Sequence, residues 1–328
     1  MKLATYRSKA GESRIALVHG ADDKLFDLAL AAERAGGAEH AFQSMLSLID
    51  SGRRGLDRAA DLLSTRGSDD ELSVALDSVE LLAPLPEPRQ MRDGMSFPTH
   101  IRQSPRGMRR LFAKGDAAAL AAIDAEPLAE LADVYRQLPI YYITNRMIVR
   151  GPGTTVTWPR YSQVMDYELE FGVVTWNTAA NIPLSRAADH IFGYTIFNDF
   201  SARDQQAKEM PGWLGPAKGK SFDGANVIGP WIVTPDEIGD PYALGMEARV
   251  NGEVWSQGRT EGMLFSFEEI LAHMSQDETV FAGEFIGSGT VGNGCGLEHG
   301  RYLQDGDTIE LEVERIGVLK NKVVRQKA

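Results

Sequence analysis

Cysteine is almost absent from the sequence. The only cysteine among the 328 residues is Cys295, so the chain has no internal disulfide and no metal site built from a cluster of cysteines. Long apolar segments are missing as well. No run of about 18 apolar residues occurs, and the first residues lack an apolar stretch of signal-peptide length. We therefore expect a cytoplasmic protein without a membrane-spanning segment.

Positive charge is also scarce. Lysine and arginine total 34, against 46 aspartate and glutamate residues, and the formal net charge is −12. Such a chain has no general electrostatic attraction to nucleic acid or to an anionic membrane, and we expect neither as a partner. The hydrophobic share of 43% and the charged share of 24% are ordinary for a globular protein and argue against a wholly disordered chain.

Several common functional motifs are missing. The sequence contains no Gly-x-Ser-x-Gly elbow and no His-Glu-x-x-His pair. The run Gly287–Gly292 (G-S-G-T-V-G) follows a predicted strand, but no helix pattern follows it, and no βαβ alternation accompanies it. The sequence therefore argues against a nucleotide-binding fold.

The most informative feature that is present is an alternating acidic stretch, Gln163–Gly172 (Q-V-M-D-Y-E-L-E-F-G). Successive side chains of a β-strand point to opposite faces, so Asp166, Glu168 and Glu170 are predicted to share one face. Aligned carboxylates repel one another unless a positive charge lies between them, and Mg²⁺ and Ca²⁺ bind carboxylate oxygens. A solvent-facing edge strand with an acidic side is the alternative, and this stretch alone leaves both interpretations open.

The pattern along the chain predicts a small, partly helical region followed by a β-rich region. Pro84, Pro86 and Pro88 stiffen the backbone and predict a linker, so we expect one domain over residues 1–85 and another over residues 86–328. The predicted strands are Lys2–Tyr6, Ser13–Val18, Ser73–Leu82, Phe171–Thr175, Ile191–Phe197, Val227–Thr234, Leu244–Val250, Glu253–Gly258, Thr308–Glu314 and Ile316–Val324, with a hairpin at Asn251-Gly252. The predicted helices are Asp22–Arg34, His40–Asp50, Gly55–Leu63, Asp116–Asp124, Pro127–Gln137 and Phe265–Met274, the last with Ser266 as N-cap.

A basic segment, Arg89–Leu111, is predicted to be mostly loop because it contains two prolines and two glycines, and the segment Gly151–Val156 is predicted to be a loop as well. In an acidic protein, the basic segment is suited to receive a small anion, although a solvated loop that pairs with nearby acids is the alternative. It contains His100, and histidine is the usual general base near neutral pH.

A mixed-charge cluster follows the predicted strand Ile191–Phe197. Asp199 ends this strand, and Arg203, Gln206 and Lys220 come shortly after it. Cations and amide donors of this kind can stabilise an oxyanion. An aspartate that caps a helix, surrounded by surface charges, is the alternative interpretation.

Four motifs in this order resemble the fumarylacetoacetate hydrolase family. They are D-Y-E-L-E at 166–170, N-D-F-S-A-R-D-Q-Q at 198–206, G-K-S-F-D at 219–223 and G-S-G-T-V-G-N-G-C-G-L-E at 287–298. The resemblance covers roughly Asp93 to the C-terminus, and the first 85 residues are similar to the small N-terminal domain of longer members. Gly224 stands where the hydrolase itself has a threonine, and the glycine-rich turn is shorter, which leaves the exact substrate open.

The resemblance implies an α+β, β-rich fold, with a small N-terminal α/β domain and a catalytic domain that forms a mixed β-sandwich roll, in a homodimer. It also implies a role for each matching residue. The implied metal ligands are Asp93, Glu168, Glu170 and Asp199, while Asp166 is not expected to be one. The implied catalytic residues are His100, Glu298, Arg203, Gln206 and Lys220. The implied substrate contacts are Tyr142, Arg109 and Thr290. The cation is expected to be Mg²⁺ or Ca²⁺, with Mn²⁺ possible.

The implied reaction is hydrolysis of a carbon–carbon bond in a small anionic 1,3-diketo acid of the fumarylacetoacetate or acylpyruvate type. His100, oriented by Glu298, would activate water, and the metal would stabilise the enolate leaving group. Three other reactions of a 2-keto acid through the same enolate are the alternatives: decarboxylation, isomerisation and dehydration. A metal-dependent binding protein without catalysis would keep the carboxylates but would have no need of His100, Arg203 and Lys220 together.

Overall fold

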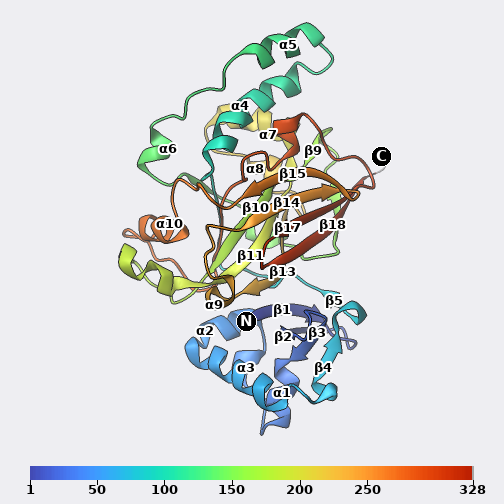
Figure 1. Cartoon of the computed structure of the whole chain (residues 1–328), viewed down its shortest axis with the longest axis vertical. Coiled ribbons are helices and arrows are strands. Elements are labelled where there is room, and N and C mark those ends of the chain that lie inside the picture. Colours follow the sequence, from blue (N-terminus) through green and yellow to red (C-terminus); the bar gives the residue numbers. More distant parts are fainter. Residues whose placement is uncertain (327–328) are drawn as a thin grey trace.

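Two large β-sheets form the centre of the computed structural model, which describes residues 1–326 (Figure 1). The 11-stranded sheet has the order β4 (Ser73–Ala75), β3 (Lys24–Asp27), β2 (Ser13–His19), β1 (Lys2–Arg7), β13 (Asn226–Val233), β11 (Ile191–Asp199), β10 (Leu169–Thr175), β16 (Phe285–Gly287), β6 (Met91–Gly94) and β7 (Tyr141–Ile143), and β5 (Glu80–Leu81) pairs with β1. The five-stranded sheet has the order β15 (Glu253–Arg259), β14 (Gly245–Val250), β17 (Thr308–Val313), β18 (Gly317–Arg325) and β8 (Thr155–Trp158). A small third sheet pairs β12 (Ser201–Ala202) with β9 (Met165–Asp166).

The helices lie around the outside of these sheets (Figure 1). The α-helices are α1 (Leu28–Arg34), α2 (Met45–Asp50), α3 (Arg53–Arg66), α4 (Pro98–Phe112), α5 (Ala117–Ala125), α6 (Val134–Gln137), α7 (Arg203–Glu209), α8 (Ala217–Lys220), α9 (Pro235–Ile238), α10 (Phe267–Met274) and α11 (Gly296–His299). The short 3₁₀ helices are η1 (His40–Phe42), η2 (Asp70–Leu72), η3 (Leu76–Ser78), η4 (Arg146–Ile148), η5 (Leu184–His190) and η6 (Met210–Gly212). Within residues 1–326, no helix has both the length and the apolar character that crossing a membrane requires.

The two sheets pack face to face, and the main hydrophobic core lies between them. Phe171 and Val173 of β10 share this core with Leu311 of β17, and all three side chains are fully buried. Burying a side chain the size of phenylalanine stabilises a fold by about 1.5–3 kcal/mol. Every residue of β10 and β11 is buried, so both faces of the large sheet are covered at its centre. Polar side chains at the ends of these two strands are therefore held away from solvent.

The opposite face of the large sheet carries a second core, which the N-terminal residues complete. Leu3 of β1 packs in this core together with Ile228 and Ile232 of β13. The strands β1 and β13 also pair directly, with Lys2 opposite Val233 and Leu3 opposite Ile232. Figure 1 shows the N-terminal elements as a blue lobe at one end of the molecule, with α4 and α5 at the other end. The division into domains at residue 85 stays a prediction.

The α+β, β-rich class predicted from the sequence is confirmed, and most strands in the second half of the chain are where the pattern places them. The Asn251-Gly252 turn joins β14 to β15, with φ angles of 51° and 83° that suit a two-residue hairpin. The predicted N-cap of α10 is confirmed too, because Ser266 accepts a hydrogen bond from the Glu269 N–H in a capping box.

Several local predictions in the first half of the chain are wrong. The basic segment is not mostly loop, because β6 and α4 occupy most of it; Pro98 begins α4 in the first turn, where a missing N–H costs nothing. The predicted helix over Asp22–Arg34 begins only at Leu28, where Asp27 caps it. Lys24–Asp27 instead forms β3, which pairs with β2.

Other differences are changes of extent. The helix predicted over Pro127–Gln137 is restricted to α6, and the helix predicted over His40–Asp50 is divided into η1 and α2. The extended segment predicted over Ser73–Leu82 is divided by η3. The predicted loop Gly151–Val156 contains the start of β8, which pairs in parallel with β18.

Candidate metal and catalytic site

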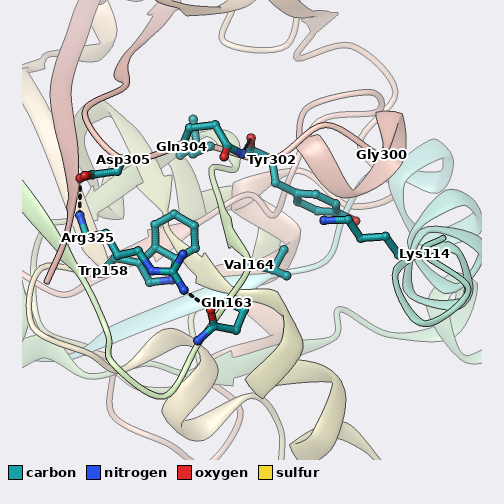
Figure 2. Close-up of a pocket in the computed structure, with 10 residues that line it drawn as sticks. Lys114, Trp158, Gln163, Val164, Gly300, Tyr302, Gln304, Asp305 and Arg325 are labelled. Carbon is teal, nitrogen blue, oxygen red and sulfur yellow. Dashed lines mark hydrogen bonds between the residues drawn. The ribbon is translucent and has the colours of Figure 1, made fainter. Parts of the chain in front are cut away.

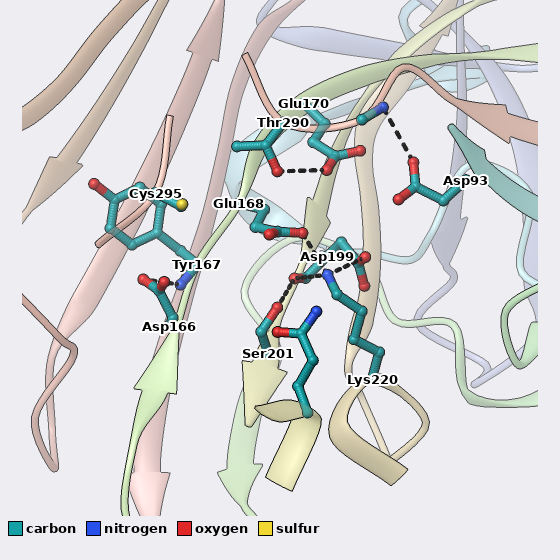
Figure 3. A network of polar contacts seen from close by, with 12 residues as sticks. Asp93, Asp166, Tyr167, Glu168, Glu170, Asp199, Ser201, Lys220, Thr290 and Cys295 are labelled. Atoms are coloured by element: carbon teal, nitrogen blue, oxygen red, sulfur yellow. Dashed lines mark hydrogen bonds and ion pairs between the residues drawn. The ribbon is translucent and has the colours of Figure 1, made fainter. Parts of the chain in front are cut away.

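Three carboxylates from neighbouring strands converge at one end of the large sheet (Figure 3). Asp93 lies on β6, Glu170 on β10 and Asp199 at the end of β11. One oxygen from each lies within 4.8 Å of an oxygen of the other two, and no more than 3% of any of these residues is exposed. The strand order β11, β10, β16, β6 explains this meeting of residues that are far apart in the sequence.

Gly287 on β16, the strand between β10 and β6, leaves space for the side chain of Asp93. Gly287 of β16 pairs with Asp93 on one side and with Gly172 on the other. A Cβ atom at Gly287 would lie 2.4 Å from Asp93 Oδ1, which is far closer than atoms can approach. The backbone N–H of Gly289 also donates a hydrogen bond of 3.2 Å to Asp93 Oδ1. The glycine-rich turn thus shapes the site through space and through its backbone.

Glu168 lies beside this cluster and is held by two cations. It follows β9 and precedes β10, so the acidic stretch is not one continuous strand. Lys220 donates to Glu168 and to Asp199, and Arg203 Nη2 lies 2.8 Å from Glu168 Oε1. All four side chains are nearly fully buried. The two cations therefore neutralise buried carboxylates of the site.

Asp166 has a structural role that is distinct from that of the cluster. It accepts hydrogen bonds from the backbone N–H groups of Gly296 (2.8 Å) and Leu297 (2.9 Å), at the start of α11. It also pairs with Arg203 Nε at 2.8 Å. Its carboxylate is thus fully engaged in holding α11 and Arg203, and it does not take part in the three-carboxylate cluster.

Burial and mutual repulsion give the carboxylates different charge states. Burial, followed by the nearby charge of Asp199, raises the pKa of Asp93 to about 8. Burial and then Asp93 raise the pKa of Glu170 well above its usual value, and burial raises the pKa of Asp199 as well. Burial would also raise the pKa of Glu168, but Lys220 and Arg203 outweigh it and lower that pKa. Without a cation, the cluster therefore retains protons at neutral pH, whereas Glu168 is ionised.

The donor atoms of the cluster fit a hard divalent cation. Glu170 Oε2 and Asp199 Oδ1 are buried and have no hydrogen-bond partner among the described residues. The second oxygens are already oriented, because Thr290 donates to Glu170 Oε1 at 3.1 Å and Tyr142 donates to Asp199 Oδ2 at 2.6 Å. Buried carboxylate oxygens without partners are costly unless something positive meets them. Mg²⁺, Ca²⁺ and Mn²⁺ all bind oxygen ligands of this kind.

A buried histidine–glutamate pair lies on two packed helices near the carboxylates. His100 Nδ1 of α4 is 3.2 Å from Glu298 Oε1 of α11, and these side chains are only 6% and 1% exposed. Cys295, the N-cap of α11, pairs with Glu168 in an isolated β-bridge, so the helix that carries Glu298 begins beside the carboxylates. When Nδ1–H donates to the glutamate, Nε2 is left as a free proton acceptor.

The remaining predicted residues divide into two groups. Tyr142 and Thr290 contact the cluster as described, and Gln206 Oε1 accepts a hydrogen bond of 3.0 Å from Arg203 Nη1. Arg109 is not brought to the cluster. Its side chain is 53% exposed and pairs with Glu126, so its predicted role as a substrate contact finds no support in the geometry. The physical reason is that α4 is a helix and directs Arg109 away from its buried face.

Asn198 is a site residue that the sequence reasoning left without a role. Its Oδ1 accepts a hydrogen bond of 3.1 Å from the Glu168 N–H, which fixes the backbone where the acidic stretch breaks. Its Nδ2 is buried and has no partner among the described residues. The signal was present, because Asn198 directly precedes Asp199 in the N-D-F-S-A-R motif.

Two surface cavities lie away from the carboxylates. One of about 430 Å³ is lined by residues that include Lys114, Trp158 and Arg325 (Figure 2). The other, of about 440 Å³, includes Thr99 and Val291, the sequence neighbours of His100 and Thr290. None of the predicted site residues lines either cavity. The chemistry of the buried cluster, rather than the size of a cavity, therefore identifies the candidate site.

Comparison with known proteins gives matches along the whole chain. The family model for the C-terminal domain of fumarylacetoacetate (FAA) hydrolase matches residues 115–324, more than half of the chain. The oxaloacetate tautomerase YisK of Bacillus subtilis is 29% identical over 310 residues, which cover 92% of this chain and 93% of that protein. The structure of the fumarylacetoacetate hydrolase of Exiguobacterium antarcticum is 28% identical, with a TM-score of 0.71, over 99% of this chain and 100% of that chain.

A more distant structure shares the fold. The maleylpyruvate hydrolase of Sphingobium sp. SYK-6, in complex with Mn²⁺ and pyruvate, has a TM-score of 0.71 at 21% identity, and each chain is covered over 100% of its length. The activities named for these relatives include both hydrolysis and tautomerisation.

Proposed function

Because the chain belongs to the fumarylacetoacetate hydrolase family, we propose that it is a metal-dependent hydrolase that cleaves a carbon–carbon bond in a small anionic 1,3-diketo acid. The observation that carries this proposal is the buried His100–Glu298 pair beside an oxygen-only metal cluster. We further propose that the enzyme acts in the cytoplasm as a homodimer. The resemblance of the sequence motifs to the family supports the dimer, and the lack of a membrane-spanning helix within residues 1–326 is consistent with the location.

The cluster would hold Mg²⁺, Ca²⁺ or Mn²⁺ through Asp93, Glu170 and Asp199, with Glu168 as the fourth predicted ligand. When bound, the cation supplies positive charge for the substrate oxygens and for the negative charge that develops on the leaving fragment. Lys220 and Arg203 keep Glu168 ionised, so that a carboxylate is ready at neutral pH. They act as positioning residues for this carboxylate.

In this proposal, the His100–Glu298 pair carries out the proton transfers. Nε2 of His100 takes a proton from water as the water oxygen attacks the distal carbonyl carbon. Glu298 holds the ring in the required tautomer and stabilises the imidazolium that forms, as the 3.2 Å contact at Nδ1 allows. When the carbon–carbon bond breaks, the imidazolium returns the proton to the departing carbon. One water is consumed, and a carboxylic acid and a keto acid are formed.

The test is an assay of purified protein with a series of acylpyruvates, with the metal present and after treatment with EDTA. The expected result is metal-dependent loss of the ultraviolet absorbance of the diketone, with one carboxylic acid and pyruvate formed in equal amounts. Release of gas with a 2-keto diacid would instead identify decarboxylation. The hydrolysis proposal fails if no acylpyruvate is cleaved at saturating metal.

Keto–enol tautomerisation of a 2-keto diacid is the second candidate. Arg203 and Lys220 each contact two buried carboxylates, so the oxyanion-stabilising role that the sequence suggests for them would compete with these contacts. The similarity to the tautomerase YisK over 92% of the chain also supports this candidate. Here His100 would move a proton between carbon and oxygen without consuming water. Metal-dependent decay of enol-oxaloacetate absorbance, with no new acid formed, would favour tautomerisation.

A further inference from the structure

A group of three different donor atoms lies beside the oxygen-only cluster. The imidazole of His100, the thiol of Cys295 and the carboxylate of Glu298 each offer one atom, and these atoms all lie within 4.8 Å of one another. We propose that His100, Cys295 and Glu298 form a second metal site, selective for zinc, whose occupation switches the enzyme off. The binding of zinc stands on its own, whereas the loss of activity rests on the proposed role of His100.

The spacing of the donors matches a zinc site. Glu298 Oε1 is 3.2 Å from His100 Nδ1, Glu298 Oε2 is 3.5 Å from Cys295 Sγ, and Sγ is 4.0 Å from Nδ1. In a tetrahedral zinc site the bond lengths of about 2.0–2.3 Å place neighbouring ligand atoms roughly 3.3–3.6 Å apart. Side-chain shifts of a few tenths of an ångström would therefore bring the three donor atoms to the spacing of a tetrahedral zinc site.

The backbone already fixes two of the donors relative to each other. Cys295 is the N-cap of α11, and Glu298 is three residues further along. Glu298 Oε2 accepts a hydrogen bond of 3.1 Å from the Cys295 N–H, so both side chains face the same side of this helical turn. The third donor comes from the first turns of α4, which packs against α11. Little conformational freedom is lost when an ion binds to such a preordered group.

Charge balance favours a divalent ion in this buried place. The S–H bond of Cys295 breaks, its proton leaves to solvent, and an S–Zn bond forms without oxidation or reduction. One thiolate and one carboxylate then neutralise Zn²⁺, while His100 binds as a neutral ring with its remaining proton on Nε2. Burial raises the pKa of the free thiol, so zinc must displace this proton, and its affinity falls as the pH falls.

The donor chemistry separates this site from the carboxylate cluster. Nitrogen and sulfur donors favour zinc, whereas Mg²⁺ and Ca²⁺ bind oxygen and are not attracted by a thiol. A zinc ion on Nδ1 displaces the contact that orients His100 and fixes the proton on Nε2, the atom that must accept a proton from water. Zinc at this site therefore removes the general base and leaves the carboxylate cluster intact.

The direct test uses Co²⁺ as a spectroscopic substitute for zinc, added to protein saturated with Mg²⁺. Because Cys295 is the only cysteine in the chain, a near-ultraviolet thiolate-to-cobalt charge-transfer band can arise only there. We expect this band in the parent protein, its loss on addition of Zn²⁺, and its absence in Cys295→Ser. His299→Ala is the matched control, since His299 is exposed and its side chain has one hydrogen-bond partner within residues 1–326, the Asn293 carbonyl, and it should keep the band.

The functional test follows turnover of the assayed substrate at saturating Mg²⁺ while Zn²⁺ is titrated. Cys295→Ser should keep its turnover and require roughly tenfold more zinc for the same inhibition. The proposal is overturned if the parent shows no charge-transfer band, or if Cys295→Ser is as sensitive to zinc as the parent, which would place inhibition at the carboxylates. A band without inhibition would retain the metal site and overturn the role of His100.

Discussion

The carboxylates of the cluster, Asp93, Glu170 and Asp199, differ from the neighbouring Glu168 in charge, and the difference comes from position rather than from residue type. All are acidic and nearly fully buried, but no basic side chain contacts Asp93 or Glu170 among the described residues, whereas Glu168 contacts Lys220 and Arg203. Burial and then repulsion by Asp199 raise the pKa of Asp93 to about 8, while the two cations, working against burial, lower that of Glu168. A divalent cation therefore competes with protons at the cluster and not at Glu168.

This competition predicts a pH dependence of metal binding. Below about pH 8 Asp93 is protonated, so binding of Mg²⁺ must release a proton, and the affinity should fall by about tenfold per pH unit for each proton released. Titration calorimetry at pH 7 in two buffers with different ionisation enthalpies measures the number of protons. A binding enthalpy that is the same in both buffers would show that the cluster is already ionised and would contradict the assignment.

The His100–Glu298 pair predicts a separation of catalysis from metal binding. His100→Gln should lower turnover by roughly 10²–10⁴-fold, which is the usual contribution of a general base, and Glu298→Gln should lower it as well. Neither residue belongs to the carboxylate cluster, so calorimetric Mg²⁺ affinity should stay near that of the parent. His299→Gln, next to Glu298 but exposed, is the control and should retain turnover. Full activity in His100→Gln would remove the general base from the proposed mechanism.

At the scale of elements, the acidic stretch shows what a sequence pattern can and cannot predict. Its alternation predicts a strand, and β10 begins within the stretch at Leu169. It does not reveal that the strand breaks at Tyr167 and Glu168, because Asn198, thirty positions away, takes the Glu168 N–H. Period-2 reasoning therefore groups Asp166 with Glu168 and Glu170, whereas the structure assigns Asp166 to the start of α11.

The same limit applies to the site as a whole. The motifs of the resemblance contain Glu170 and Asp199, whereas Asp93 lies outside them, and the order of residues along the chain predicts none of the contacts between these carboxylates. His100 meets Glu298 across 198 positions, and that meeting depends on how α4 packs on α11. The resemblance implies that Arg109 contacts the substrate, in a segment expected to be mostly loop; the structure places Arg109 on a helix and paired with Glu126, away from the carboxylates.

The close approach of Gly287, on β16, to Asp93 leads to a prediction about metal binding. Gly287→Ala would place a methyl group 2.4 Å from Asp93 Oδ1 and 3.1 Å from a ring carbon of Phe197, so Asp93 must move away. We expect Mg²⁺ affinity to fall by roughly tenfold or more, the scale of lost support for a metal ligand. The control is Gly212→Ala, where a Cβ meets no atom within 4 Å. Calorimetry on both variants decides the point, and unchanged affinity in Gly287→Ala would show that Asp93 does not bind the ion.

At the scale of the whole molecule, the first 85 residues complete the rest of the protein. The three prolines indicate a linker. The composition of the chain does not show that β1, which precedes this linker, pairs with β13, which follows it. Leu3, Leu17 and Phe26 lie in one core with Ile228 and Ile232, and all five are buried. Sequence reasoning could not anticipate this shared core, because an apolar residue on a strand does not indicate which distant segment covers it.

Removal of this cover has a measurable consequence. A fragment of residues 86–328 would expose the apolar face that carries Phe192, Ile228, Ile232 and Phe285, and it would leave one side of β13 without a partner strand. An exposed apolar face next to an open strand edge promotes association. We therefore expect the fragment to bind a hydrophobic dye and to aggregate at concentrations where the full chain stays in solution. Circular dichroism melting, dye fluorescence and gel filtration measure this. A soluble fragment with a cooperative melting transition and full Mg²⁺ affinity would instead show that the catalytic part folds independently and that the shared core is dispensable.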